Sequence, residues 1–466
     1  MLDWLEDSKL PIPVLVVATD SLENVERTVL SRKNSASLWR IGTTHVDSSA
    51  LAHTLAGLAP PLPGCPRSIT RRITIKVERT SARYYVRNGQ YDFLESGDIP
   101  YTERAALDNM ISNVEKMSPF TPADTVTKVR VDWYDKAIRE GQRLFNVLIR
   151  DTVGPHLLAL LQNPHTLTEE VCSLDGDCKQ VLTPCPLDMR FEIVFGSTDY
   201  AKLFQLPFEH VNHSDFDGVL CSRIPMARRV RMMDSPPQIY AKPFVNRPLR
   251  ILFMDSDVHG DVSLPKDTVY GKTGTFSFAK LNSSAEELRL LMELKARLGE
   301  ERIAAVDVIG SASLGVFGQD LKNEVEDKLR YGDYGLFHFC GHSVTADDGL
   351  THLLFHGAQD RPLPVSIRDV AGWMQAGNCK MLVLSSCEGA SVLSAIETMR
   401  LGAHGMIGFR WVVKDEACLQ YFRHFYRSFL EDRRTFSESY QLACEGLRRT
   451  SVAEPTWASA VAVVLD

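Results

Sequence analysis

The sequence predicts an α/β protein with a doubly wound, mostly parallel sheet sandwiched by helices, preceded by an α+β region. Three observations carry this prediction. Apolar strands alternate with amphipathic helical segments from residue 250 onward. Two of those strands are continuous apolar runs bounded by glycine, which is typical of strands buried on both faces of a parallel sheet. Earlier in the chain, Ile73 to Val77 alternates with a period of two, which indicates an antiparallel hairpin.

The chain is predicted to divide into three parts. Closely spaced prolines from Pro60 to Pro66 can continue neither a helix nor a central strand, so they mark the first boundary. Residues 1–66 are expected to be a small α/β segment with a regulatory or docking role. Residues 67–249 form the predicted α+β region. Residues 250–466 form the predicted catalytic part, because the regular alternation of strands and helices begins there.

Hydrophobic periodicity and turn residues predict the individual elements. In the first 249 residues, strands are expected at 13–19, 37–42, 73–77, 84–86 and 189–195, with a helix at 133–150. In the remainder, strands are expected at 250–256, 303–309, 334–342, 380–387, 405–409 and 458–465, with helices at 285–298, 319–330, 366–376, 389–401, 417–430 and 436–450. The polar stretch 255–282 is too long for an ordinary connection, so we hypothesise that it is an activation or processing loop.

Two of these strands end in residues that can form a catalytic pair, His342 and Cys387. A thiol needs a nearby base to become a nucleophilic thiolate at neutral pH. The helix expected between the two strands is a crossover connection, which makes them parallel near-neighbours, and reactive groups gather beyond the carboxyl ends of such strands. We therefore predict that the two side chains meet as the dyad of a cysteine peptidase. His338 and Cys340, inside the first strand, are expected to be structural.

Composition argues against several other classes of protein. The chain is 44% hydrophobic, and it contains no apolar run near the roughly 20 residues that span a membrane. Its first residues lack the pattern of a signal peptide, and its ten cysteines are scattered, so reduced thiols and a cytoplasmic location are predicted. The net charge of -7 argues against nucleic-acid binding, and the basic run from Arg223 to Arg231 is interpreted as a solvated strand flank.

No cofactor and no metal are predicted. Cys172, Cys178 and Cys185 lack a Cys-x-x-Cys pair, so they are interpreted as loop residues. The run from Gly271 to Thr273 resembles the end of a phosphate-binding loop, but Lys266 stands where the first glycine should be. Nucleotide hydrolysis is therefore not expected.

The motifs resemble the CHAT family of caspase-like peptidases, within the wider clan that includes caspases and separases. The resemblance rests on the runs Phe337–His342, Leu382–Gly389 and Gly402–Asp415, with Leu206–Glu209 and Pro455–Trp457 as outer landmarks. It implies a caspase-like doubly wound fold, with a pseudo-caspase-like or CHAT N-terminal part before it. It also implies a cysteine endopeptidase, with a role in prokaryotic antiviral defence or programmed cell death.

The resemblance also implies a role for each site residue. Cys387 would be the nucleophile and His342 the general base, with backbone N–H groups at Cys387 and Ser343 as the oxyanion hole. Ser343 stands where caspases place glycine, which keeps the backbone donor but adds a side chain. Arg410 and Trp411, which follow the next strand, are expected to contact the substrate.

Acidic residues near the motifs bear on specificity. Asp347, Asp348 and Asp415 would favour Arg or Lys at the cleaved position if they line the substrate pocket. Aspartate at a strand end is also often a turn or cap residue, and Asp415 precedes a predicted helix. A preference for a medium-sized apolar residue therefore stays open.

The sequence thus predicts a regulated cysteine endopeptidase that acts on proteins, with an activating protein or a processing protease as a further expected partner. Two alternatives stay open. One is a catalytically inactive caspase-like adaptor, in which the sheet only binds a partner protein. The other is a signal-binding protein, whose binding module would lie within the first 240 residues.

Overall fold

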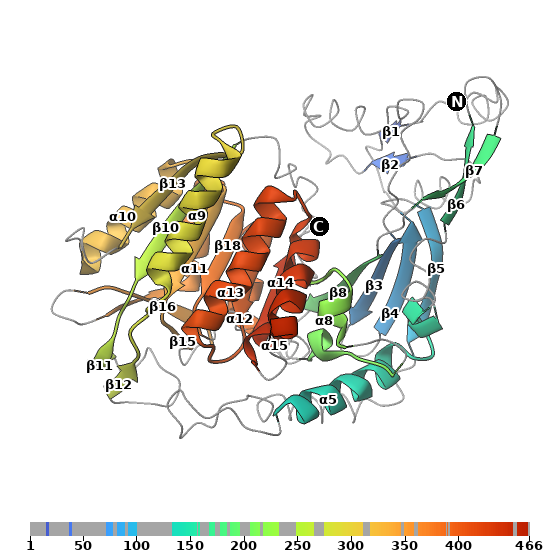
Figure 1. Ribbon diagram of the computed structural model, residues 1–466, viewed down its shortest axis with the longest axis horizontal. Helices are drawn as coiled ribbons and strands as arrows, with labels where there is room; N and C mark the ends of the chain where they lie inside the picture. Colours follow the sequence, from blue (N-terminus) through green and yellow to red (C-terminus); the bar gives the residue numbers. More distant parts are fainter. Residues whose placement is uncertain are drawn as a thin grey trace.

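A central sheet of eleven strands runs through the molecule (Figure 1). In spatial order its strands are β13 (Ile303–Ile309), β10 (Leu249–Ser256), β14 (Leu336–Gly341), β18 (Met381–Ser385), β19 (Gly405–Phe409), β20 (Ala460–Val464), β9 (Met226–Met232), β8 (Leu187–Phe195), β3 (Arg71–Val77), β4 (Ala82–Asn88) and β5 (Asp92–Ile99). This computed structural model describes residues 15–17, 37–39, 71–77, 82–88, 92–99, 133–155, 157–158, 167–172, 178–183, 187–195, 206–214, 218–232, 248–264, 275–310, 317–345, 349–357, 362–387, 389, 392–450 and 454–464.

The sheet is mostly parallel. Every neighbouring pair from β13 to β19 is parallel, as are the pairs that link β20, β9, β8 and β3. The pairs β19–β20, β3–β4 and β4–β5 are antiparallel. The predicted mostly parallel α/β sheet and the predicted antiparallel hairpin are both confirmed. Because β20 pairs with β9, the sheet also continues across the boundary predicted at residue 249.

Helices cover both faces of the C-terminal half of the sheet, which runs from β13 to β20. One face carries α9 (Ser284–Leu298), α13 (Asp415–Tyr426) and α14 (Phe436–Thr450), and the other carries α10 (Gly318–Tyr331), α11 (Ile367–Ala376) and α12 (Val392–Arg400) (Figure 1). In the other half, α5 (Trp133–Leu148) and the short α8 (Leu220–Arg223) pack against η3 (Phe208–His210). A helix on each face of a parallel sheet is the arrangement that the strand and helix alternation predicts.

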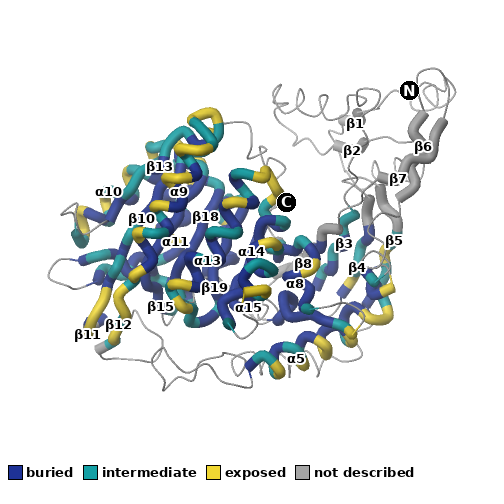
Figure 2. Tube along the Cα trace, in the orientation of Figure 1, coloured by how far each residue is buried: buried dark blue, intermediate teal, exposed yellow. Residues whose placement is uncertain are grey.

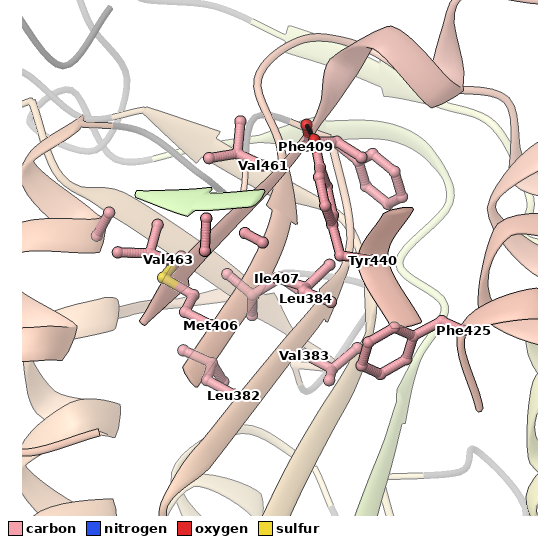
Figure 3. Close-up of a cluster of buried hydrophobic side chains, with 14 of the residues drawn as sticks. Leu382, Val383, Leu384, Met406, Ile407, Phe409, Phe425, Tyr440, Val461 and Val463 are labelled. Carbon is pink, nitrogen blue, oxygen red and sulfur yellow. Dashed lines mark hydrogen bonds between the residues drawn. The ribbon is translucent and has the colours of Figure 1, made fainter. Parts of the chain in front are cut away.

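The core of the C-terminal half is built from strands that are buried along their whole length. This holds for β14, β18, β19 and β20, as their continuous apolar runs predict. In Figure 3, Leu382 and Val383 of β18 and Ile407 of β19 lie among apolar side chains that include Phe425 of α13. Burial of one such side chain stabilises the fold by roughly 1.5–3 kcal/mol. Figure 2 shows this buried centre in dark blue.

Two small sheets that contact each other lie where no strands are predicted, and strands β5 and β9 of the central sheet are likewise not predicted. The hypothesised activation loop contains a hairpin of β11 (Gly260–Ser263) and β12 (Thr275–Phe278), and β15 (Ser343–Thr345), β16 (Thr351–Phe355) and β17 (Leu363–Ser366) form an antiparallel sheet. Their strands have three to five residues, too few for a clear period. A small apolar cluster joins the two sheets and consists of Val258, Val262, Leu264, Val344 and Leu354. An activating role for this stretch stays a prediction.

Where the structure describes them, the other predicted elements agree with it to within four residues at their ends. Residues 456–459 form a short helix, α15 (Thr456–Ser459), so the final strand begins at Ala460 and not at residue 458. In the first 66 residues, the structure describes the two predicted strands, β1 (Leu15–Val17) and β2 (Ser37–Trp39), as a parallel pair. The hairpin of β6 (Leu167–Cys172) and β7 (Cys178–Thr183) is also not predicted, and η6 (Arg427–Glu431) extends α13. Cys172 ends β6 and Cys178 begins β7, so the interpretation as loop residues is wrong for these two. Cys185 and the run from Gly271 to Thr273 lie outside the described residues.

Candidate active site

The strands that lead to the predicted dyad are neighbours. β14 and β18 are parallel and paired, with Cys340 opposite Ser385. His342 comes directly after β14, and Cys387 comes two residues after β18. Because neighbouring strands lie about 4.8 Å apart, both residues leave the same edge of the sheet side by side. The predicted crossover helix between them is α11.

Hydrogen bonds connect the loops at this edge. The Ser343 hydroxyl donates to the backbone carbonyl oxygen of Cys387, so the loop after β14 touches the loop after β18. Sγ of Cys387 lies 3.9 Å from the carbonyl oxygen of Val413, in the segment after β19. The segments that follow β14, β18 and β19 therefore meet at this edge, with Cys387 between the other two.

His342 is held in one tautomer by the segment that follows β12. Its Nε2 lies 2.8 Å from the carbonyl oxygen of Ala279, and its ring packs 4.9 Å from the ring of Phe278. A carbonyl oxygen only accepts, so Nε2 carries the hydrogen and Nδ1 is left as a lone-pair acceptor. Burial lowers the pKa of His342 below its ordinary value near 6.5. The ring is therefore neutral at pH 7, with a basic nitrogen available.

Cys387 is exposed differently from the other cysteines. Among the cysteines that the structure describes with side chains, it is half-buried and the others are buried. Burial raises the pKa of Cys340 and of Cys418 well above that of an ordinary thiol, and it raises the pKa of Cys379 to about 12. Deeply buried thiols of this kind are chemically inert. Among these cysteines, Cys387 is therefore the one whose thiol is partly open to solvent.

Asp415 contacts the backbone at the start of α9. Its Oδ2 accepts a hydrogen bond of 2.7 Å from the backbone N–H of Ser283, and Lys414 is the N-cap of α13, with Asp415 as the first helical residue. Asp257, after β10, accepts in the same way from Leu281 at 2.9 Å. The charges of both aspartates raise the pKa of His342 and oppose the effect of burial. They therefore lie close enough to influence the site.

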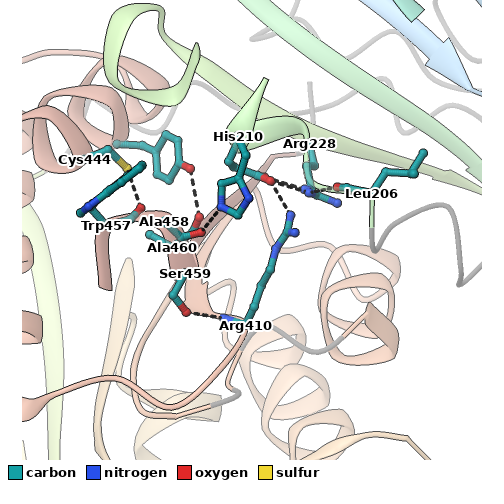
Figure 4. Close-up of polar contacts among 11 residues, drawn as sticks. Leu206, His210, Arg228, Arg410, Cys444, Trp457, Ala458, Ser459 and Ala460 are labelled. Atoms are coloured by element: carbon teal, nitrogen blue, oxygen red, sulfur yellow. Dashed lines mark hydrogen bonds and ion pairs between the residues drawn. The ribbon is translucent and has the colours of Figure 1, made fainter. Parts of the chain in front are cut away.

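Arg410 is largely buried and paired. Its guanidinium contacts the carboxylate of Glu209, which also accepts hydrogen bonds of 2.7 and 2.6 Å from Nε and Nη2 of Arg228 (Figure 4). The backbone N–H groups of Arg410 and Trp411 both bond to Ser459. Two outer landmarks of the family resemblance, around Glu209 and Ser459, thus meet at the segment after β19. Arg410 and Trp411 support this segment, and their contact with substrate stays a prediction.

The interpretation of the basic run from Arg223 to Arg231 as a solvated flank is wrong for Arg228. This residue lies in the central strand β9 and is fully buried. Its buried charge is compensated because Glu209 and the carbonyl oxygen of Leu206 accept its hydrogen bonds. Asp347 and Asp348 lie outside the described residues. Their predicted contact with substrate is not addressed by the structure.

Two residues at the site carry no signal in the sequence. Ala279 contributes a backbone carbonyl oxygen, which every residue possesses. Glu287 points from α9 into the sheet and contacts both His338 and Ser385. A glutamate in an amphipathic helix usually faces solvent, so sequence patterns do not single it out. His338 and Cys340, expected to be structural, are both buried.

The described residues contain no group of three or more His, Cys, Asp or Glu side chains placed to hold a metal ion. None of the described helices is long and apolar enough to cross a membrane.

The fold is of the cysteine-peptidase type, and the loops that carry His342 and Cys387 leave neighbouring parallel strands at the same edge of the sheet. The CHAT domain matches residues 139–463, which is more than two thirds of the sequence. The chain therefore belongs to the CHAT domain family.

Solved structures with a similar fold include a cysteine proteinase and a separase. The Arg-specific cysteine proteinase gingipain R is 10% identical, with a TM-score of 0.38 over 72% of this chain and 74% of its own. Separase of Saccharomyces cerevisiae, in complex with securin, is 9% identical, with a TM-score of 0.43 over 85% of this chain. The match spans only 30% of the separase chain. No curated protein matches the sequence.

Proposed function

We propose that the protein is a cysteine endopeptidase in which Cys387 is the nucleophile and His342 is the general base. The observation that carries the proposal is the 2.8 Å contact between Nε2 of His342 and the carbonyl oxygen of Ala279. This contact leaves Nδ1 of His342 free to accept a proton. His342 follows β14, which is paired with β18, the strand that leads to Cys387. The half-buried state of Cys387 supports the same assignment.

The proposed reaction follows from these positions. Nδ1 of His342 takes the proton of the Cys387 thiol, and the thiolate attacks the carbonyl carbon of the scissile bond. Backbone N–H groups of Cys387 and Ser343 donate to the oxyanion of the tetrahedral intermediate. When the C–N bond breaks, the leaving amine takes the proton from His342, and a thioester remains on Cys387. Water, deprotonated by His342, then hydrolyses the thioester and restores the thiol.

For specificity we propose a preference for Arg or Lys at the cleaved position. Asp415 and Asp257 place negative charge near His342, and Asp347 and Asp348 are further candidates from the sequence. A carboxylate at the base of the pocket pairs with a guanidinium or an ammonium group. Preference for a medium-sized apolar residue is the competing outcome, because Asp415 already bonds to the backbone of Ser283.

Family membership further supports a regulated role. We propose that the enzyme is an effector of prokaryotic antiviral defence or programmed cell death, acts in the cytoplasm on protein substrates, and is switched on by an activating protein or a processing protease. An open thiolate peptidase would damage its own cell, so control of this kind is required. The hairpin of β11 and β12 is a candidate for the controlled element, because the segment after it contacts His342.

The test compares wild-type protein with Cys387→Ala on a proteome-derived peptide library and on itself, with all new termini read by mass spectrometry. Cys379→Ala is the matched control, because that buried thiol lies at the opposite end of β18. We expect cleavage by wild type and by the control but not by Cys387→Ala, mostly after Arg or Lys. Equal termini from wild type and Cys387→Ala would contradict the proposal.

A catalytically inactive adaptor is the second candidate, and Ser343 is the observation that favours it. Its side chain lies against the Cys387 carbonyl, where a glycine would leave space for the substrate. In that case Ser343→Gly would create cleavage that wild type lacks. For an active wild type, we expect Ser343→Gly to cleave the same bonds.

The pH dependence of the reaction gives a further expected outcome. Since burial lowers the pKa of His342, the ring stays a neutral base down to a lower pH than an ordinary histidine. The acidic limb of kcat/KM should therefore lie below pH 6.5, measured on the best peptide from the library. An acidic limb above pH 6.5 would contradict this expectation.

A further inference from the structure

A row of buried polar side chains lies between the sheet and the helices α9 and α13, before the ends of β14 and β18. The proposed chemistry does not use these side chains. Glu287 of α9 is 1% exposed, and its Oε2 lies 2.9 Å from Nε2 of the fully buried His338. Its other oxygen, Oε1, accepts a hydrogen bond of 2.8 Å from the hydroxyl of Ser385. On its far side, His338 places Nδ1 2.6 Å from the hydroxyl of Tyr426 in α13.

Both oxygens of Glu287 are used, and they reach different strands. His338 belongs to β14, which leads to His342, and Ser385 is the last residue of β18, two positions before Cys387. A carboxylate this deep in an apolar core loses its hydration, and an apolar side chain of similar size is often the more stable choice. The position of Glu287 therefore points to a task other than stability. It ties together the two strands that carry the base and the nucleophile.

The start of α9 also contacts the other parts of the site. Ala279 holds His342 through its carbonyl oxygen, and the backbone N–H of Ser283 bonds to Asp415 in the segment after β19. Residues 279–287 therefore touch the histidine at one end and the cysteine strand at the other. A shift of this segment would change both contacts at once.

We infer that Glu287 is a positioning residue, and that the segment from Ala279 to Glu287 fixes Cys387 relative to His342. The inference rests on the proposed function and deepens it. Glu287 acts through Ser385, whose hydroxyl bonds to the carboxylate and not to His338. The row is therefore not a second Ser-His-acid triad. It sets where β18 ends, and a single residue in a bend, Ser386, links that position to Cys387.

The test measures the reactivity of Cys387 directly, so it needs no peptide substrate. Intact protein is treated with iodoacetamide, and the rate of alkylation at Cys387 is read by peptide mass spectrometry at pH 7.5. Ser385→Ala removes one hydroxyl and should slow alkylation about tenfold, because an ångström-scale displacement of a reacting group has effects of this size or larger. Glu287→Leu should slow it at least as much.

Two variants separate positioning from general loss of structure. Glu287→Gln should stay within about twofold of wild type, because His338 can change tautomer and accept from the new amide while Ser385 still donates. Ser428→Ala is the matched control, since its hydroxyl is buried and makes no hydrogen bond among the described residues. It should leave the rate unchanged. Circular dichroism checks that each variant is folded.

The inference is overturned if Ser385→Ala alkylates as fast as Ser428→Ala, or if Glu287→Gln is as slow as Glu287→Leu. His342→Ala tests the proposed function separately, because loss of the base should slow alkylation whatever Glu287 does. If His342→Ala is alkylated slowly and Ser385→Ala at the wild-type rate, only the inference about Glu287 is contradicted. If both variants are alkylated at the wild-type rate, the proposed dyad is contradicted as well.

Discussion

Two buried carboxylates, Glu209 and Glu287, show how differently the same chemical group is used in two regions of this molecule. Glu209 faces two guanidinium groups, those of Arg228 and Arg410. Glu287 faces an imidazole and a hydroxyl. Arginine keeps its charge and only donates, whereas histidine can change its tautomer or its proton. The donors around Glu209 are therefore fixed, whereas the histidine beside Glu287 can exchange donor and acceptor roles.

The location of each cluster matches this difference. The Glu209 cluster joins β9 and η3 to β19, so it holds the two halves of the sheet together. The Glu287 cluster lies within the C-terminal half, between α9, β14 and β18. Fixed charges suit a junction between two halves of a sheet, while partners that can exchange a proton suit the proposed active site. Removing the carboxylate should accordingly have unequal consequences.

The largest expected effect is that of Glu209→Gln. The new amide would point donors at two guanidinium groups, and the fully buried Arg228 would keep its charge without a counter-ion. Breaking such a buried pair costs about 3–5 kcal/mol. Urea unfolding of the full chain measures the loss in the free energy of unfolding. A loss below about 1 kcal/mol would mean that Arg228 is stabilised by other contacts, on the scale of a single hydrogen bond.

Acid should weaken the Glu209 region through its neighbour His210. Burial lowers the pKa of His210 to about 4, and its Nε2 donates to the carbonyl oxygen of Ala458. The unfolded chain binds this proton near pH 6.5, so stability is intact above that pH and falls as the pH drops toward 4. The loss is roughly 3 kcal/mol. His210→Asn should abolish that part of the pH dependence in urea unfolding, while His259→Asn, at an exposed site, should retain it.

A smaller effect is expected for Glu287→Gln. His338 can present Nε2 as an acceptor and Nδ1–H to Tyr426, so every hydrogen bond has a counterpart and no charge is stranded. The expected loss is about 1 kcal/mol, the net value of a hydrogen bond. If the loss in urea unfolding matched that of Glu209→Gln, the distinction between a fixed and an adjustable cluster would fail.

The smallest effect on stability is expected at an ion pair that is exposed to solvent. Arg83 and Asp98 form an ion pair of 2.6 Å across β4 and β5, with both side chains more than half exposed. Water and salt screen such a pair, so Asp98→Ala should change the free energy of unfolding less than any substitution above, as measured by urea unfolding. A larger change at this surface pair would show that pairing, not burial, controls the energies of the two clusters.

The sequence predicts this fold well where one strand or helix carries its own pattern. The apolar runs before His342 and Cys387 predict both strands, because burial on two faces of a sheet requires a continuous apolar stretch. They also predict that both strands end at the same edge of the sheet. Contacts between distant residues have no such pattern. Nothing in the sequence links Glu287 with Ser385, or Glu209 with Arg410, because the sheet order that joins them is set by tertiary packing. The contact of the Ala279 carbonyl with His342 is likewise invisible, since it uses a main-chain atom.

The place of β20 in the sheet has a consequence for how the protein is made. This strand is the last of the described strands along the chain, yet it lies between β19 and β9, in the interior of the sheet. A ribosome releases residues 460–464 after all the other described strands, so until then β19 and β9 each lack a neighbour. The segment after β19 also lacks its backbone bonds to Ser459 during that time. The backbone pairing that joins the two halves of the sheet therefore forms only when synthesis has passed this strand.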